Sequence, residues 1–255
     1  MKKLLLILLC LPMIGFGQNV NIPDANFIAY LVGNTSINTN GDTEIQVSEA
    51  SVFNGAIDCN SMSISDLTGI EDFTALAELN CDVNQLTTLD VSNNLALTYL
   101  DCEMNQLISL DVSNNAALSV LACNDNPLTS LDLSSTIALT NLYLQEMYNL
   151  SSLDLRNGNN QNLYDLGINN APNLYCINVD NVAWSTTNWT SANYSIDSHH
   201  YFSENCNGTT SIQEHTTNKE LLKVTDLLGR ETEQTNQPLF YIYDDGTVEK
   251  RIVIE

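Results

Sequence analysis

Basic residues are scarce in this sequence. Eight Lys and Arg stand against 31 Asp and Glu, which gives a formal net charge of −23. From residue 18 to residue 206 there are 22 acidic residues and one basic residue, Arg156. A surface of this charge repels nucleic acid and anionic membranes at long range, so we expect neither as a partner. Cations, basic partners and neutral sugars stay open as ligands, and solubility of an exported chain is an equally good explanation of the charge.

Long apolar runs are also scarce. The run that stands out, MKKLLLILLCLPMIGFG over residues 1–17, has the basic start, apolar middle and small-residue end of a secretory signal peptide. No later run approaches the roughly 20 residues that span a bilayer, so we expect no transmembrane segment. The sequence predicts a secreted protein, extracellular or attached to the outer cell surface.

Catalytic motifs are missing as well. The three histidines, His199, His200 and His215, are accompanied by no nucleophile elbow, phosphate loop or His-rich metal motif. The carboxylates are arranged as an exposed acidic surface, which gives no reason for the perturbed pKa values that general acid–base catalysis needs. We therefore expect no enzymatic activity.

The sequence does contain a repeat of 21 residues. LAELNCDVNQLTTLDVSNNLA, over residues 76–96, is followed by LTYLDCEMNQLISLDVSNNAA and LSVLACNDNPLTSLDLSSTIA. A fixed period of this length is typical of a solenoid, in which each coil buries its apolar side against its neighbours. About six coils share one apolar position, occupied in turn by Cys59, Cys81, Cys102, Cys123, Leu144 and Ile168.

Each coil is expected to contribute two short strands and two polar positions. Segments such as LDC and ISLDV alternate apolar and polar residues, so we expect two parallel strand stacks joined by Asn- and Ser-rich turns. The first polar row should hydrogen-bond backbone groups at an inward turn, and consists of Asn84, Asn105 and Asn126. The second should accept hydrogen bonds from turn amides, with a cation-binding stripe as the alternative, and consists of Asp90, Asp111, Asp132 and Asp154.

The coils, of the form LxxLxCxxNxLxxLDxSxNxA, resemble bacterial leucine-rich repeats with a buried cysteine ladder, as in internalin-like surface proteins. The resemblance covers residues 57–181. It implies an α/β to mainly β fold, a right-handed leucine-rich repeat solenoid of about six 21-residue coils. An N-terminal cap over residues 18–56 and a C-terminal cap over residues 182–206 are expected to close its ends, because a terminal coil otherwise exposes its apolar cross-section.

Six cysteines follow the signal peptide. Four of them, the ladder cysteines, should project inward in parallel, which suits neither disulfide geometry nor the convergent ligands of a zinc site. We expect Cys59, Cys81, Cys102 and Cys123 to be buried free thiols that act as small hydrophobes. Cys176 and Cys206 lie off the ladder, and we predict a disulfide between them that closes the C-terminal cap.

The N-terminal cap contains a loop that matches an EF-hand in outline. A short helix is expected to begin near Asp24, and residues 38–49 follow it. The candidate calcium ligands are Asn38, Asn40, Asp42, Glu44 and Glu49. Asn38 and Thr43 depart from the usual Asp and Gly, so the alternative is a cap that keeps the shape of the loop without an ion. Calcium is the one candidate cofactor.

The tail, residues 207–255, is expected to be a linker and a small β domain. LFYIY and RIVIE, separated by DDG, predict a hairpin. KVTDLLGRE and KRIVIE, with Asp226, Gly229, Arg230 and Lys250, resemble the C-terminal sorting domain of type IX secretion cargo. The resemblance implies a partnership with the type IX secretion machinery and removal of the tail by a surface sortase, within about residues 205–220.

The variable positions around each ladder residue form an extended surface, the strand face. Rings among amides and carboxylates suit a glycan or a basic protein segment. We expect a binding or adhesion module, with a structural spacer, stabilised by calcium or not, as the alternative. The positions are Glu78, Asn80, Asp82, Tyr99, Asp101, Glu103, Val120, Ala122, Asn124, Asn141, Tyr143 and Gln145.

Overall fold

In a computed structural model the chain divides into two compact units, residues 1–206 and 207–255. The structure describes residues 18–191, 195–206, 221–225, 231, 238–243 and 248–252. The predicted signal peptide, residues 1–17, lies outside these ranges, as do Asp226, Gly229 and Arg230 of the predicted sorting signal.

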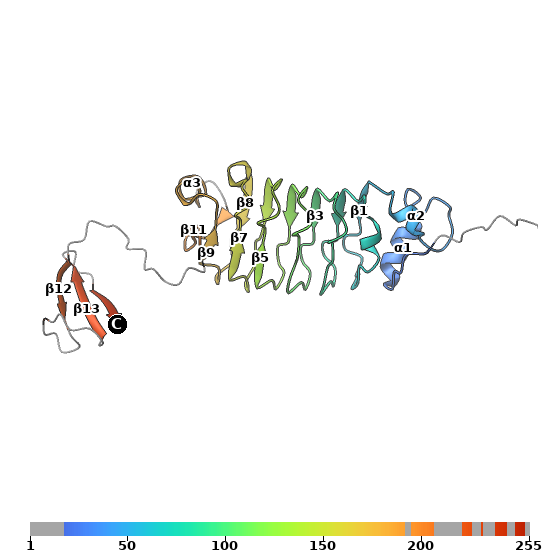
Figure 1. Cartoon of the computed structure of the whole chain (residues 1–255). Coiled ribbons are helices and arrows are strands. Elements are labelled where there is room, and N and C mark those ends of the chain that lie inside the picture. The colour runs from blue at the N-terminus through green and yellow to red at the C-terminus, as the bar shows by residue number, and fades with distance from the viewer. Residues whose placement is uncertain are drawn as a thin grey trace, which may run out of the picture. The chain divides into compact units, whose positions relative to one another are not determined.

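The first unit contains a parallel β-solenoid (Figure 1). Its larger sheet has the strand order β1-β2-β3-β4-β6-β8-β10, and its smaller sheet has the order β11-β9-β7-β5, with parallel pairing throughout. The two predicted strand stacks are therefore confirmed. The larger sheet contains β1 (Ala56–Asp58), β2 (Glu78–Asn80), β3 (Tyr99–Asp101), β4 (Val120–Ala122), β6 (Asn141–Tyr143), β8 (Asp165–Ile168) and β10 (Ser195–Ile196). The smaller contains β5 (Ser130–Asp132), β7 (Ser152–Asp154), β9 (Cys176–Asn178) and β11 (Tyr201–Ser203).

The solenoid has about seven turns rather than about six. The segment expected only to cap it adds one strand to each sheet, β10 and β11. Ile196 pairs in register with Ile168, so it continues the row of ladder positions. The period is longer at this point because helix α3 (Val182–Asn188) is inserted before β10, which hides the turn from a search at fixed spacing.

Columns of identical side chains fill the core. Leu79, Leu100, Leu121 and Leu142 are in register on successive strands and fully buried. Burial of each such side chain contributes roughly 1.5–3 kcal/mol. Because neighbouring strands lie about 4.8 Å apart, equal side chains stack on one another, and the repeat period follows from this stacking.

Buried asparagines satisfy the backbone where the turns close. The Asn105 side-chain amide donates to the carbonyls of Cys81, Cys102 and Glu103 at 3.0–3.1 Å, and its oxygen accepts from the amide of Leu86 at 3.0 Å. Asn84 and Asn126 donate in the same pattern, which confirms the structural interpretation of this row.

A second buried row was not anticipated from the sequence. Asn94 donates to the carbonyls of Ile70 and Phe73, and Asn115 donates to those of Val91 and Asn94. Both side chains are fully buried. The repeat contained this asparagine too, within the predicted Asn- and Ser-rich turns, but the sequence did not single it out.

The ladder cysteines are free and fully buried. The thiols of Cys81 and Cys102 each donate to the carbonyl of a residue in the next turn, Asp101 at 3.3 Å and Ala122 at 3.5 Å. Burial raises the pKa of Cys59 to about 12 and that of Cys81 well above its usual value. Such thiols are inert toward thiolate chemistry.

Alkylation should therefore distinguish the two groups of cysteines. Iodoacetamide is expected to modify none of the four ladder thiols in the native chain, all four after denaturation, and two further cysteines after reduction. Mass spectrometry of the peptides counts the modified sites. Rapid modification of a ladder thiol in the folded chain, or a disulfide between two of them, would contradict this description.

The N-terminal segment covers the first turn. Helix α1 (Ala25–Gly33) begins after Asp24, whose carboxylate accepts from the amides of Asn26 and Phe27, and it buries Phe27 and Leu31. The hydroxyl of Tyr30 accepts from the amide of Asp58 in β1 at 2.9 Å. Because β1 is the edge strand, this contact satisfies a donor that no further strand reaches. Two shorter helices, α2 (Val47–Ala50) and η1 (Ile70–Asp72), lie nearby in the chain.

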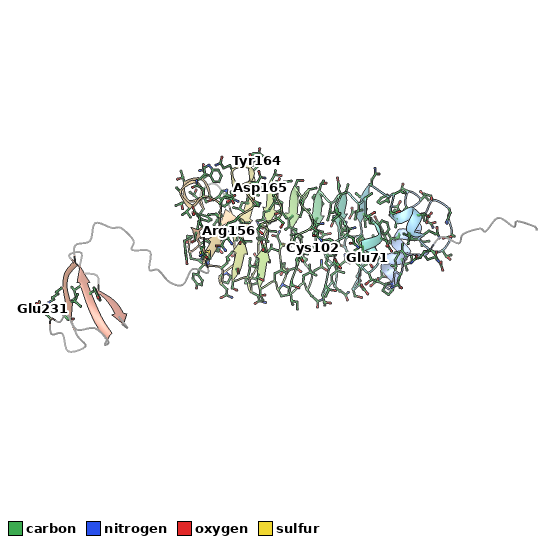
Figure 2. The ribbon with its side chains drawn as sticks, in the orientation of Figure 1. Glu71, Cys102, Arg156, Tyr164, Asp165 and Glu231 are labelled. Carbon is green, nitrogen blue, oxygen red and sulfur yellow. A yellow bond between two sulfur atoms is a disulfide. The ribbon has the colours of Figure 1, made fainter. Side chains whose placement is uncertain are left out.

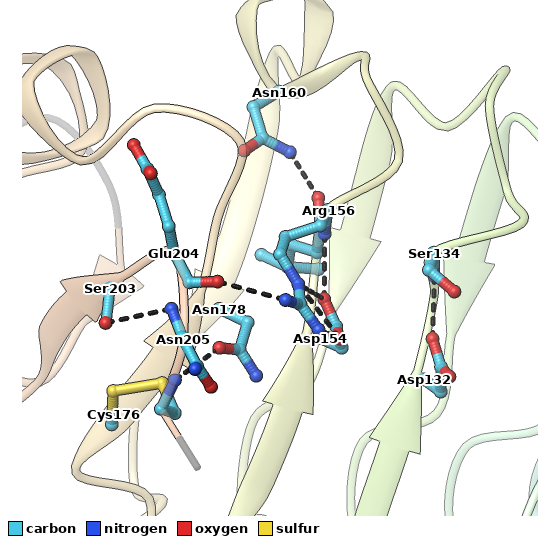
Figure 3. Close-up of polar contacts among 12 residues, drawn as sticks. Asp132, Ser134, Asp154, Arg156, Asn160, Cys176, Asn178, Ser203, Glu204 and Asn205 are labelled. Carbon is cyan, nitrogen blue, oxygen red and sulfur yellow. Dashed lines mark hydrogen bonds and ion pairs between the residues drawn. A yellow bond between two sulfur atoms is a disulfide. The ribbon is translucent and has the colours of Figure 1, made fainter. Parts of the chain in front are cut away.

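The last turns are tied together by covalent and polar links (Figure 3). The predicted disulfide between Cys176 and Cys206 is present. Arg156, which follows β7, pairs with Asp154 and donates to the carbonyl of Glu204 at 3.0 Å. The amide of Cys206 donates to the side chain of Asn178 at 2.7 Å. A short helix, η2 (Asn160–Asn162), precedes β8.

The second unit is a three-stranded antiparallel sheet. Its order is β12-β13-β14, formed by β12 (Leu221–Thr225), β13 (Pro238–Tyr243) and β14 (Val248–Ile252). The pairing of β13 with β14 confirms the predicted hairpin. Lys250, the remaining residue of the predicted sorting signal, belongs to β14.

Candidate binding surface

The strand face follows the larger sheet along the solenoid. Glu78 is exposed, most of the other predicted positions are partly exposed, and Ala122 is buried and offers no surface. Asp165 on β8 belongs to the same face because it is in register with Asn141. It is labelled in Figure 2 beside Tyr164, which is 72% exposed. The face thus runs from β2 to β8 without interruption.

Side chains of the strand face hydrogen-bond along the sheet. The hydroxyl of Tyr143 donates to the carboxylate of Asp165 at 2.7 Å. The side-chain amide of Asn124 donates to Glu103 at 2.6 Å and its oxygen accepts from the backbone amide of Gln145 at 2.6 Å. These bonds hold rings and carboxylates in fixed positions, so a ligand would meet a preorganised surface.

Three carboxylates are crowded where β2 and β3 end. Burial is the largest cause that raises the pKa values of Asp82, Asp101 and Glu103. Repulsion adds to it, from Asp101 and Asp58 on Asp82, from Asp58 on Asp101, and from Asp101 and Asp82 on Glu103. One oxygen of Asp82 is buried without a hydrogen-bond partner in the described part of the chain. Burial and the neighbouring Asp101 also raise the pKa of Tyr99 to about 12. The site therefore holds negative charge at an energetic cost, which a cation from outside would offset.

Two exposed apolar residues border this cluster and were missed from the sequence. Val83 (φ 51°) and Met104 (φ 49°) lie in the left-handed region and are 40% and 51% exposed. Asp125 and Glu146 have the same backbone conformation, so the turn itself requires it. A left-handed residue other than Gly costs roughly 1–2 kcal/mol, and most for a β-branched one such as Val83. An Asn or Gly would have revealed the turn.

The predicted calcium loop is closed by its own hydrogen bonds. Asn38 is buried, and its amide donates to the carbonyls of Val32 and Asp42. The carboxylate of Glu49 accepts from the backbone of Thr39, Asn40 and Gln46 and from the Thr39 hydroxyl. The side-chain oxygen of Asn40 accepts from the backbone amide of Asp42. The carboxylate of Asp42 accepts from the backbone amide of Glu44. Calcium binding stays a prediction, which calorimetric titration of the full chain with CaCl₂ tests.

Glu49 makes the N-terminal cap sensitive to acid. Burial raises its pKa, but the hydrogen bonds from Gln46, Thr39 and Asn40 outweigh this and leave the pKa below the usual 4.5. The stabilisation is therefore present above pH 4.5 and lost as the pH falls through the lowered value. We expect Glu49→Gln to destabilise the chain by about 1 kcal/mol at pH 7 and by less at acid pH. Urea unfolding at pH 7 and pH 3.5 measures this; an equal loss at both would contradict it.

The aspartates of the second strand stack have a structural role. The carboxylates of Asp90, Asp111 and Asp132 each accept from the backbone amide of a serine two residues later, at 2.9 Å. These serines lower the pKa values of Asp90 and Asp111. The predicted turn hydrogen bonds are confirmed, and they explain how a row of like charges is tolerated.

Sequence comparison connects the chain to one curated relative. No protein-family model matches it. Internalin J of Listeria monocytogenes serotype 4b (strain F2365) is 51% identical over 39 residues, or 15% of this chain and 4% of internalin J. The chain thus resembles internalin J over a short stretch, and it spans far less than two thirds of that relative.

Structure comparison finds internalins of the same species, InlJ among them. The functional domain of InlJ, which includes a cysteine ladder, shares 29% identity at a TM-score of 0.39, over 64% of this chain and 38% of that one. The internalin inlF shares 19% identity at a TM-score of 0.44, over 67% and 55%. The strand pairings of this chain themselves define its solenoid. Among the described residues, no helix has the length and apolarity that a membrane span requires.

Proposed function

We propose that the chain is an exported, non-catalytic binding module that recognises a cationic segment of a protein partner on its strand face. The observation that carries this proposal is the position of Asp82, Asp101 and Glu103 at the ends of β2 and β3, where burial disfavours the charged carboxylates and so raises their pKa values. The strands of the larger sheet and the two residues after each contain no Lys or Arg in the described part of the chain.

Apolar and aromatic groups around the cluster support recognition rather than simple solubility. Tyr99 lies beside Asp101, and the exposed side chains of Val83 and Met104 follow in the same turns. The left-handed backbone is common to the repeat turns, so what supports recognition is the exposure of these two apolar side chains beside carboxylates. The pattern fits a partner segment that presents Lys or Arg together with an apolar residue.

Export and surface location belong to the same proposal. The signal-peptide pattern of residues 1–17 and the tail with Asp226, Gly229, Arg230 and Lys250 predict delivery by type IX secretion and subsequent removal of the tail. The resemblance of the repeats to those of internalin-like surface proteins supports this location. Sequencing both termini of the protein recovered from a secreting cell tests it, since we expect loss of residues 1–17 and a new C-terminus near residues 205–220.

The binding proposal is tested on an array of extracellular proteins and glycans. We expect the full chain to bind a basic protein, and a Tyr99→Ala/Tyr143→Ala variant to bind at least tenfold more weakly, because truncation of aromatic anchors typically costs 1–2 kcal/mol or more. If the chain binds a glycan and no basic protein, the partner is a glycan rather than a cationic protein segment. Silence across the array, with calcium and with chelator, would favour the spacer alternative.

A further inference from the structure

Three potential metal ligands lie close together at the C-terminal end of the solenoid. They are distant in sequence from the carboxylates Asp82, Asp101 and Glu103 of the strand face. Asp197, His199 and His200 lie between β10 and β11. One ligand atom from each lies within 4.8 Å of the other two. The sequence predicted no metal motif here, although the three residues lie within four consecutive positions.

His200 lies at the centre of the group. Its side chain is fully buried. Nδ1 lies against the carbonyl oxygen of Leu174, and Nε2 lies 3.1 Å from the carbonyl oxygen of Ile168 and 3.7 Å from the carboxylate of Asp197. Each of these oxygens, with Asp197 ionised, can only accept a hydrogen bond.

A neutral imidazole cannot satisfy this environment. It has one N–H group, and if that group is on Nδ1 and donates to Leu174, the lone pair of Nε2 faces two oxygens. Opposed lone pairs in a buried site are unfavourable. A positive centre beside Nε2, either a metal ion or a proton, would remove the conflict.

The surrounding groups favour a metal ion. An imidazole that ligates a metal commonly donates its other N–H to a backbone carbonyl, as Nδ1 of His200 is placed to do toward Leu174. A separation of 3.7 Å between Nε2 and the Asp197 oxygen suits two ligands that each lie about 2.0–2.2 Å from one zinc ion. His199 adds a second imidazole, its ring centroid 4.4 Å from that of His200 and 5.3 Å from the ring of Tyr175. Because His199 is exposed, an ion can enter from solvent.

We propose that Asp197, His199 and His200 bind a divalent transition-metal ion of the zinc type. Two imidazoles and one carboxylate suit zinc better than calcium or magnesium, which prefer oxygen ligands alone. The carboxylate of Asp197 also accepts from the amide of Ala171 at 3.0 Å, and His200 contacts carbonyls on both sides of that residue. The ion would hold Asp197 and His200 in the positions from which they contact the preceding turn, a role separate from the strand-face function.

Zinc titration of the full chain tests the site. The protein is stripped with chelator, dialysed and titrated with ZnCl₂ by calorimetry, with thermal unfolding followed in parallel. We expect one zinc ion per chain and a higher melting temperature with zinc. His199→Ala and Asp197→Asn should each weaken the affinity at least tenfold. Both residues are at least partly exposed, so these variants should fold, and His215→Ala is the matched control that should bind as the wild type does.

Other results would overturn the proposal. No saturable binding, equal binding by the wild type and both ligand variants, or loss of binding in His215→Ala would each do so. If zinc binds but leaves the melting temperature unchanged, the ion does not stabilise this end of the solenoid and the proposed role is wrong.

Discussion

Asn105→Ala is expected to destabilise the chain by about 3 kcal/mol or more. The substitution removes a side chain that satisfies three carbonyls and one amide, and these groups belong to two successive turns. A buried backbone group left without a partner costs roughly 1–3 kcal/mol, and the site is too enclosed for water to replace four bonds freely. In a solenoid each turn contacts only its neighbours, so the lost hydrogen bonds weaken the interface between these two turns directly.

Denaturant unfolding of the full chain, monitored by circular dichroism, measures this effect. Asn93→Ala is the matched control, since Asn93 is exposed in a turn within the repeat of residues 76–96 and its loss should change the unfolding free energy by no more than about 0.5 kcal/mol. A loss in Asn105→Ala no larger than in the control would show that the buried row does not hold the turns together.

A second variant should change the unfolding free energy in the opposite direction. We expect Asp101→Asn/Glu103→Gln to stabilise the chain by about 1 kcal/mol at pH 7. Burial and repulsion from neighbouring carboxylates raise both pKa values, so the charged forms disfavour the folded state. The amide side chains keep an oxygen that can accept the bonds from the Glu103 amide and from Asn124. Removal of the charge therefore relieves repulsion with limited loss of hydrogen bonding.

The pH dependence of this gain follows from the direction of the shifts. A carboxyl group with a raised folded pKa favours folding below its unfolded value and loses that contribution as the pH rises through the folded value. The advantage of the variant should be largest at neutral pH and vanish below about pH 4, near the unfolded values of these groups. Glu78→Gln, on the exposed edge of the same face, is the control and should be close to neutral. A destabilised double variant at pH 7 would contradict the account of the cluster.

Much of the fold could be predicted because the repeat period follows directly from stacking. A leucine or cysteine that returns every 21 residues occupies the same hole in each turn, so the core, the free thiols and the first asparagine row were all readable. The disulfide was predictable because Cys176 and Cys206 lie off that period. The seventh turn was not, since α3 interrupts the spacing before Ile196.

The candidate sites were less accessible to sequence reasoning. The sequence predicted which positions form the strand face, but it did not predict how deeply each side chain is buried. The raised pKa values of Asp82, Asp101 and Glu103 depend on that burial. Val83 and Met104 gave no sign of a left-handed turn because their residue types rarely adopt one. The environment of His200 depends on the carbonyls of Leu174 and Ile168, which no residue pattern reveals.

The central claim is that the strand face, rather than the overall negative charge, recognises a cationic partner. The most direct measurement is the affinity of a lysine- and arginine-rich peptide for three forms of the full chain: the wild type, Asp101→Asn/Glu103→Gln and Asp90→Asn/Asp111→Asn. The two variants lose the same net charge, one from the strand face and one from the second strand stack. We predict at least tenfold weaker binding for the strand-face variant and near wild-type binding for the other. Equal weakening of both would show that the peptide responds only to net charge, and the claim would be wrong.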